Sequence, residues 1–92
     1  MKAVTEEMIP TNPMGAEPDS IPPNSLKVSV DGNNAICFIQ ERWGSEKIVI
    51  IFEKPHQEWG EFFTTKYFRF EEPGKMLWGH DGNYMKLELI EN

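Results

Sequence analysis

The sequence predicts a mainly β protein, a small antiparallel meander or open barrel of about five to six strands with a Pro-rich irregular N-terminal tail. From Leu26 onward, apolar residues alternate with polar ones or form short runs, which is typical of strands. Turn-forming sequences rich in Gly, Asn and Pro separate these segments. No stretch shows a capped apolar stripe of helical period. A two-layer sandwich is the second choice of architecture, and an α+β fold in which the tail forms a short helix is the third.

The proline content divides the chain near residue 24. Five of the seven prolines lie before that point, and proline removes a backbone donor and interrupts helices and strand ladders. We therefore interpret residues 1–24 as a flexible or strap-like tail and residues 25–92 as a single β-rich domain. As a strap, the tail would pack on the domain or on a partner through Met8, Ile9 and Met14. If the domain is complete without the tail, its removal leaves cooperative unfolding intact.

Six segments of the domain carry strand patterns. Residues 26–30 alternate apolar and polar side chains, and residues 61–70 carry aromatic rings on both faces. Residues 31–34 (DGNN) supply turn chemistry, and the Pro73-Gly74 pair fits a type II turn. The order of the segments suits consecutive antiparallel hairpins. The six segments are residues 26–30, 35–40, 47–53, 61–70, 76–79 and 84–90.

The charge balance disfavours a polyanion as the partner. Nine basic residues against 15 acidic ones give a net charge of −6. Arg42, Lys47 and Lys54 each have a glutamate beside them, which is typical of a solvated surface. Nucleic acid and anionic membranes are therefore not expected partners. The N-terminus lacks an apolar signal region and no run approaches the roughly 20 apolar residues of a membrane span, so the expected location is cytoplasmic.

No motif predicts catalysis, a metal or a cofactor. Cys37 is the lone cysteine and lies in an apolar run, so neither a disulfide nor a cysteine-based zinc site is expected. His56 and His80 lack the paired spacing of metal ligands. No serine stands in a GxSxG sequence, and no Gly-rich phosphate loop occurs. We therefore expect a protein that is not an enzyme and that holds no metal or cofactor.

Three tryptophans mark the candidate functional surface. Trp43, Trp59 and Trp78 each precede a glycine, at the end of an expected strand or in a turn. In a structural interpretation, the rings cap the open ends of the barrel. In the functional interpretation, they form a partly exposed aromatic surface among acidic side chains, a composition favoured at protein interfaces. The predicted partner-binding residues are Trp43, Trp59, Trp78, Glu58, Glu61 and Asp81.

These observations favour a small acidic module that binds another protein without catalysis, as an inhibitor or accessory factor does. Inhibitors encoded by phages and mobile elements share this profile, but the likeness rests on size and charge only. Two alternatives stay open. A pocket holding two Trp rings would favour a small ligand or an oligosaccharide. Basic residues converging on one face would favour single-stranded nucleic acid, and the candidates are Lys27, Lys66, Arg69 and Lys86. The exposed edges of a small sheet also leave a homodimer open.

Overall fold

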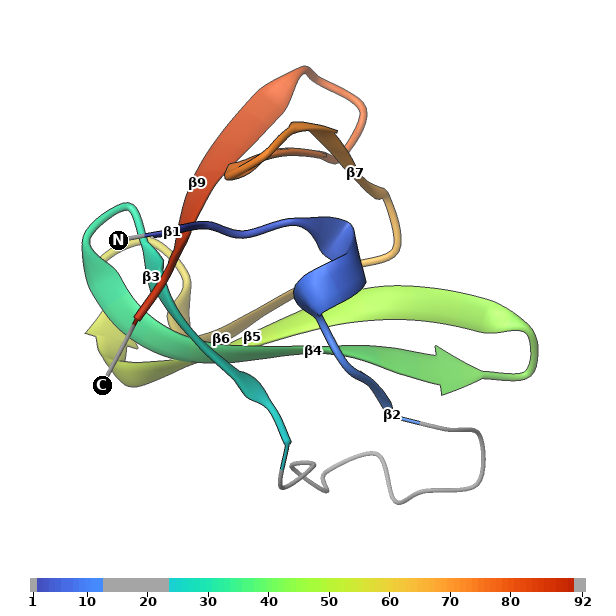
Figure 1. Ribbon diagram of the computed structural model, residues 1–92, viewed down its shortest axis with the longest axis horizontal. Coiled ribbons are helices and arrows are strands. Elements are labelled where there is room, and N and C mark those ends of the chain that lie inside the picture. Colours follow the sequence, from blue (N-terminus) through green and yellow to red (C-terminus); the bar gives the residue numbers. More distant parts are fainter. Residues whose placement is uncertain (1, 13–23, 91–92) are drawn as a thin grey trace.

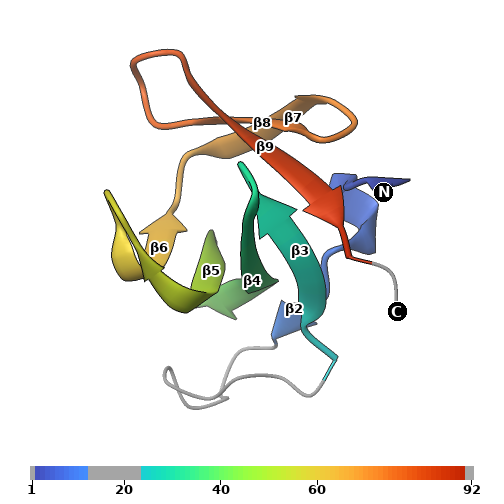
Figure 2. The ribbon, with the colours of Figure 1, turned by 90° about the vertical axis from the view of Figure 1, so that its left-hand side faces the viewer.

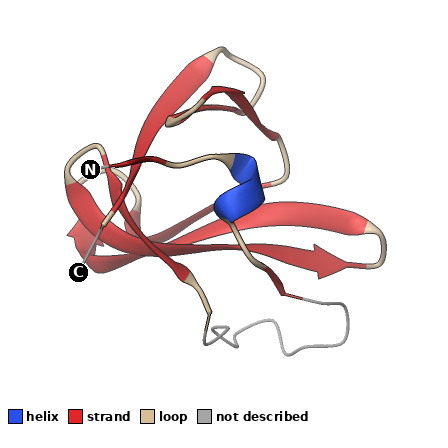
Figure 3. Ribbon diagram, viewed as in Figure 1, coloured by secondary structure: helices blue, strands red, loops and turns tan. Residues whose placement is uncertain are grey.

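A computed structural model describes residues 2–12 and 24–90, which form nine strands and one short 3-10 helix (Figure 1). Figure 3 shows that strands make up most of this described chain. The N-terminal elements are β1 (Lys2–Ala3), η1 (Glu6–Met8) and β2 (Thr11–Asn12). The other strands are β3 (Leu26–Val30), β4 (Asn33–Arg42), β5 (Ser45–His56), β6 (Gly60–Thr65), β7 (Phe68–Glu72), β8 (Lys75–Trp78) and β9 (Asn83–Leu89).

The strands form one curled sheet in the order β6-β5-β4-β3-β9-β8-β7, with β1 added to β9 and β2 to β4. Its two halves are the meanders β3–β6 and β7–β9, which are joined by the antiparallel pairing of β3 with β9. Figure 2 shows the sheet curling around its core as a half-barrel. The described chain is therefore mainly β and antiparallel, as predicted, with the parallel pairing of β2 and β4 as the exception.

The core lies on the inner face of this curl, where alternate residues of the long strands point inward. In β4, the side chains of Ala35, Cys37 and Ile39 lie in this core, and Phe38, which points to the other face, is also buried. Burial raises the pKa of the Cys37 thiol to about 12, so this cysteine is a packing residue and not a nucleophile at neutral pH. The buried core residues are Val4, Ile9, Val28, Val30, Ala35, Cys37, Ile39, Ile48, Ile50, Phe52, Met76, Met85 and Leu87.

Two hairpins close through two-residue turns in which both residues have positive φ. Asp31-Gly32 joins β3 to β4 with φ of 50° and 91°, and Trp43-Gly44 joins β4 to β5 with φ of 54° and 75°. Such turns match the right-handed twist of paired strands, and they favour Asn, Asp or Gly. Asp31 suits its position. Trp43 does not, because the left-handed conformation costs a side chain with a Cβ about 1–2 kcal/mol.

The described residues contain nine strands, so the predicted number of about five to six was wrong. The strand expected at residues 61–70 is two strands, β6 and β7, which lie at opposite edges of the sheet. The chain bends between them, where the Thr65 hydroxyl accepts a hydrogen bond from the Tyr67 N–H at 3.1 Å. The other two additional strands, β1 and β2, contain two residues each, which is too few for a period-two pattern.

Residues 2–12 belong to the sheet, and an irregular tail is not supported for them. Val4 is fully buried and Ile9 is 5% exposed. The Val4 N–H donates to the Leu87 carbonyl at 3.1 Å, and the Val4 carbonyl accepts from the Gly74 N–H at 2.7 Å. Two core residues therefore come from the segment that the sequence analysis interprets as a tail.

The rest of the predicted tail, residues 13–23, lies outside the described residues, and Met14 lies with it. The division of the chain at residue 24 stays a prediction. Met8 is half-buried beside the buried Ile9, which is compatible with the strap interpretation for this part of the chain. In the described ranges 2–12 and 24–90, no helix has the length and apolar character needed to cross a membrane.

Candidate functional site

Trp59 and Trp78 meet in an aromatic cluster between the two halves of the sheet. Trp59 lies in the turn after β5 and Trp78 ends β8, and their ring centroids are 6.1 Å apart in an edge-to-face arrangement. Phe63 of β6 lies 5.0 Å from each of these rings. Because β6 and β8 are not hydrogen-bonded neighbours in the described sheet, these side chains hold the two halves together. We call Phe52, His56, Trp59, Phe63 and Trp78 the aromatic seam.

His56 fixes the turn that carries Trp59. Its ring stacks on Trp59 with centroids 4.4 Å apart. Its Nδ1 accepts the N–H of Glu58 at 2.9 Å and that of Trp59 at 3.4 Å. A nitrogen that accepts these two donors carries no proton, so this atom orients the turn. Within residues 2–12 and 24–90, no group of three or more His, Cys, Asp and Glu side chains is arranged to hold a metal ion.

Trp43 stands apart from the aromatic seam, at the tip of the β4–β5 hairpin. It is 85% exposed, and none of the ring contacts among the described residues includes it. The described part of β2 pairs with β4 as far as Gln40, and β6 pairs with β5 only from Ile48 onward. Residues 41–47 therefore project as a two-stranded hairpin ribbon, which extends to the right in Figure 1.

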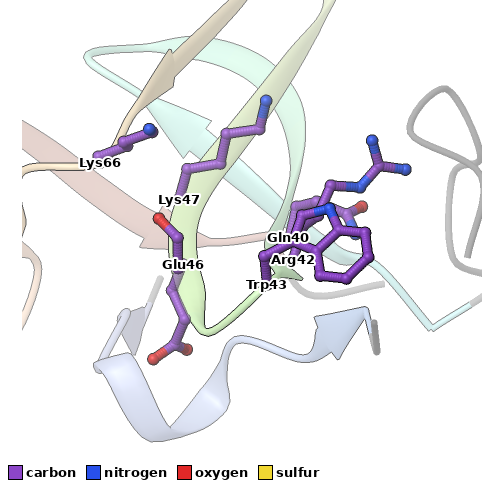
Figure 4. A pocket seen from close by; sticks show the side chains of 7 residues that line it. Gln40, Arg42, Trp43, Glu46, Lys47 and Lys66 are labelled. Carbon is purple, nitrogen blue, oxygen red and sulfur yellow. The ribbon is translucent and has the colours of Figure 1, made fainter. Parts of the chain in front are cut away.

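A surface pocket of about 370 Å³ opens beside Trp43 (Figure 4). Its base includes Gln40, which is buried and whose Oε1 accepts the Nδ2–H of Asn12 at 2.8 Å. Three cationic side chains and one carboxylate contribute to the walls. The lining residues are Gln40, Arg42, Trp43, Ser45, Glu46, Lys47 and Lys66. The pocket therefore combines an exposed indole ring with an excess of positive charge, on a chain whose net charge is negative.

Strand alternation sorts the charges of the hairpin ribbon onto two faces. Ile39 of β4 and Ile48 of β5 are cross-strand partners that point into the core. Because side chains alternate along each strand, Arg42 and Lys47 lie on the outer face of the sheet. Glu41 and Glu46 are cross-strand partners on the opposite face. Figure 4 shows the Glu46 carboxylate directed away from the amino groups of Lys47 and Lys66. The outer face of the ribbon is therefore basic, and the other face is acidic.

The sequence interpretation missed this basic face. It treated each cation beside a glutamate as part of a mixed, solvated surface. Along a strand, adjacent side chains point to opposite faces, so the segment ERWGSEK separates its glutamates from its cations. Alternation along each strand, combined with a two-residue turn that pairs Arg42 with Ser45, would have placed Arg42 and Lys47 on one face. Lys66 follows β6, and its place beside them depends on the pairing of Thr65 with Ile48, which the local pattern does not give.

The predicted partner-binding residues occupy separate places. Trp59 and Trp78 lie together in the aromatic seam, and Trp43 lies alone at the hairpin tip. The three predicted acidic residues are exposed but do not line the pocket beside Trp43; they are Glu58, Glu61 and Asp81. The single aromatic surface surrounded by acids that the sequence suggested is thus divided, and the charge beside the exposed tryptophan is mostly basic.

The basic residues named for the nucleic-acid alternative do not all join this pocket. Of that set, Lys66 lines it. Arg69 is paired with Glu71 at 2.8 Å, and Lys86 with Glu88 at 3.7 Å. Comparisons of the chain with protein family models, curated proteins and solved structures find no match. The geometry of the chain itself is therefore the basis for a functional proposal.

Proposed function

We propose that the chain is a non-catalytic binding module that docks on a partner protein through the tip of its β4–β5 hairpin. The observation that carries this proposal is the 85% exposure of Trp43. Tryptophan is among the residue types most enriched at interface hot spots. Exposure of so large an apolar ring to water is unfavourable, and a partner that buries the ring recovers that free energy.

The backbone at Trp43 supports the same proposal. Its φ of 54° is unfavourable for a tryptophan, whereas Asp31 in the equivalent turn is a residue type that adopts this conformation readily. The exposed ring makes no aromatic contact among the described residues that would offset this cost. A residue that lowers the stability of a turn is commonly retained for function. A projecting hairpin with an exposed ring suits an inhibitor or accessory factor that occupies a surface of its partner.

The oligosaccharide alternative has less support. It requires two Trp rings that line one concave pocket. Trp59 and Trp78 pack edge to face against each other and against Phe63. Trp43 is the single tryptophan in the lining of its pocket. The interpretation of the tryptophans as packing residues therefore suits Trp59 and Trp78, and the interface interpretation suits Trp43.

Capture of partners from a nuclease-treated lysate of the source organism tests this proposal. Trp43→Asn removes the ring and suits the turn, because asparagine adopts positive φ at low cost. Tyr84→Ser is the matched control, because Tyr84 is 49% exposed and lies on β9, in the other half of the sheet. We expect the wild-type chain and Tyr84→Ser to capture the same partner protein. We expect Trp43→Asn to lose at least about 90% of it, as the loss of a hot spot implies.

Equal capture by Trp43→Asn and by the wild-type chain would contradict the proposal and assign partner binding to another surface. Loss of capture in Tyr84→Ser but not in Trp43→Asn would move the interface to β9. Both variants need the wild-type circular dichroism spectrum, so that a change in capture reports on the interface and not on folding.

A further inference from the structure

We propose that the hairpin recognises an acidic segment of its partner, a short stretch of Asp and Glu residues that lies on the outer face between Trp43 and Lys66. This inference rests on the proposed function, because it names the chemistry of the surface that the hairpin docks on. Three observations support it: the grouping of three cations, their lack of carboxylate partners among the described residues, and the charge of the rest of the chain.

The pocket beside Trp43 gathers three of the nine basic residues of the chain, Arg42, Lys47 and Lys66. Like charges placed close together repel each other, and a bound anion removes that repulsion. None of the three forms an ion pair with a carboxylate of the described residues; the two pairs found there lie on β7 and β9. The guanidinium of Arg42 is free to bind a carboxylate through two parallel hydrogen bonds, and the lysines offer further donors.

Trp43 supplies an apolar surface next to these cations. Trp43 and Arg42 both line the pocket (Figure 4). A partner segment that carries acidic side chains and an apolar one would place its carboxylates on the cations and its apolar side chain on the indole. Arg and Trp together are the residue types most enriched at the centres of protein interfaces.

The charge outside the pocket favours a short acidic segment over a nucleic acid strand. The pocket's charged side chains contribute +2 to a net charge of −6, so the rest of the chain carries −8. A strand long enough to leave the pocket would meet this negative surface, beginning with Glu41 on the reverse of the ribbon. The volume of about 370 Å³ is near the lower end of the roughly 300–1,000 Å³ of typical ligand pockets, so it accommodates few side chains.

Binding of defined probes to the full-length chain, followed by fluorescence anisotropy, tests the inference. The first probe is a short fluorescein-labelled peptide that alternates Glu with Leu. The second carries Lys in place of each Glu, and the third is an oligothymidine with the same charge as the first. We expect the acidic peptide to bind with an affinity that falls as the NaCl concentration rises. We expect the other two probes to bind at least about tenfold more weakly.

Two double variants with equal net charge locate the binding site. Lys47→Glu with Lys66→Glu reverses two cations of the pocket. Lys27→Glu with Lys54→Glu makes the same change at exposed lysines that do not line the pocket. We expect the first variant to weaken binding of the acidic peptide at least about tenfold, and the second to change it by less than about threefold. All four lysines are exposed, and urea unfolding verifies that both variants fold.

Three results would overturn the inference: no binding of the acidic peptide up to about 1 mM, equal weakening by both double variants, or equally tight binding of the oligothymidine. These results are distinct from a failure of the proposed function. Partner capture that requires Trp43 but tolerates the reversal of Lys47 and Lys66 would retain the docking role and reject the acidic segment. Partner capture that does not require Trp43 would reject the docking role itself.

Discussion

The hairpin ribbon and the aromatic seam carry the same Trp-Gly sequence in opposite surroundings. Trp59 packs among the rings of the seam, 4.4 Å from His56 and 5.0 Å from Phe63. Trp43 is 85% exposed, beyond the point where the described parts of β2 and β6 support the β4–β5 hairpin. The position of a tryptophan in the curled sheet, and not its local Trp-Gly sequence, therefore decides whether its ring is packed or exposed.

The aromatic contacts of the seam stabilise the fold, whereas the backbone conformation at the hairpin tip destabilises it. In the seam, each aromatic pair contributes about 0.5–1.5 kcal/mol beyond the burial of its surface. At the hairpin tip, the positive φ of Trp43 costs about 1–2 kcal/mol, and no aromatic contact among the described residues offsets it. We therefore expect the seam to stabilise the curl of the sheet, and we propose that the tip serves recognition.

The largest expected effect is the destabilisation caused by Trp59→Ala. Removal of this ring leaves a cavity between the two halves of the sheet, and we expect the free energy of unfolding to fall by about 3 kcal/mol. Trp43→Ala, the matched control, is expected to change it by less than about 0.5 kcal/mol, because the ring is exposed. Urea unfolding followed by circular dichroism measures both. Similar losses in the two variants would remove the distinction between tip and seam.

Alanine substitution at two turn glycines is expected to lower the free energy of unfolding by intermediate amounts. Gly74 and Gly44 have similar φ, +79° and +75°. A Cβ at Gly74 would lie 3.1 Å from the Ala3 Cβ and 3.3 Å from the Leu87 carbonyl oxygen. A Cβ at Gly44 would have no such neighbour within 4 Å among the described residues. Alanine at either position costs about 1 kcal/mol or more through its backbone conformation. We expect Gly74→Ala to cost at least about 1 kcal/mol more, because of the added crowding against β1.

The same unfolding measurement checks this expectation, with the difference between the two midpoints as the readout. Equal losses for Gly74→Ala and Gly44→Ala would show that β1 does not pack against the turn between β7 and β8. That result would return residues 2–12 to the irregular tail that the sequence suggested.

Much of the fold was predictable because the long strands follow the physical rule of alternation. The period-two pattern identified β3, and β-branched runs identified the middles of β4 and β5. The turn at Pro73-Gly74 was predictable from the φ angles that proline and glycine adopt, and Gly74 has a φ of 79°. The two-residue strands β1 and β2 were not predictable, because their evidence lies in long-range contacts, such as the hydrogen bond between the Gly74 N–H and the Val4 carbonyl. The break between β6 and β7 was not predictable either. The chain passes there from one edge of the sheet to the other, and no local sequence pattern indicates this passage.

The candidate site was predictable in part. Trp43 was among the predicted residues because, like the other two tryptophans, it precedes a glycine at the end of an expected strand or in a turn. The sequence could not separate it from Trp59 and Trp78, since their meeting depends on the curl that brings β6 toward β8. The basic face was missed because charges were compared along the chain and not across the strand. Lys66 joins Lys47 there through the register of β6 on β5.

The free energy of unfolding of Trp43→Asn tests the central claim most directly, and it is the smallest effect. Asparagine adopts the conformation that this turn requires, and the exposed ring that it replaces contributes little packing. We expect this variant to have a stability equal to that of the wild-type chain or higher by up to about 1 kcal/mol. A fall of about 1 kcal/mol or more would show that Trp43 packs in the fold, and it would contradict the assignment of the hairpin tip to recognition.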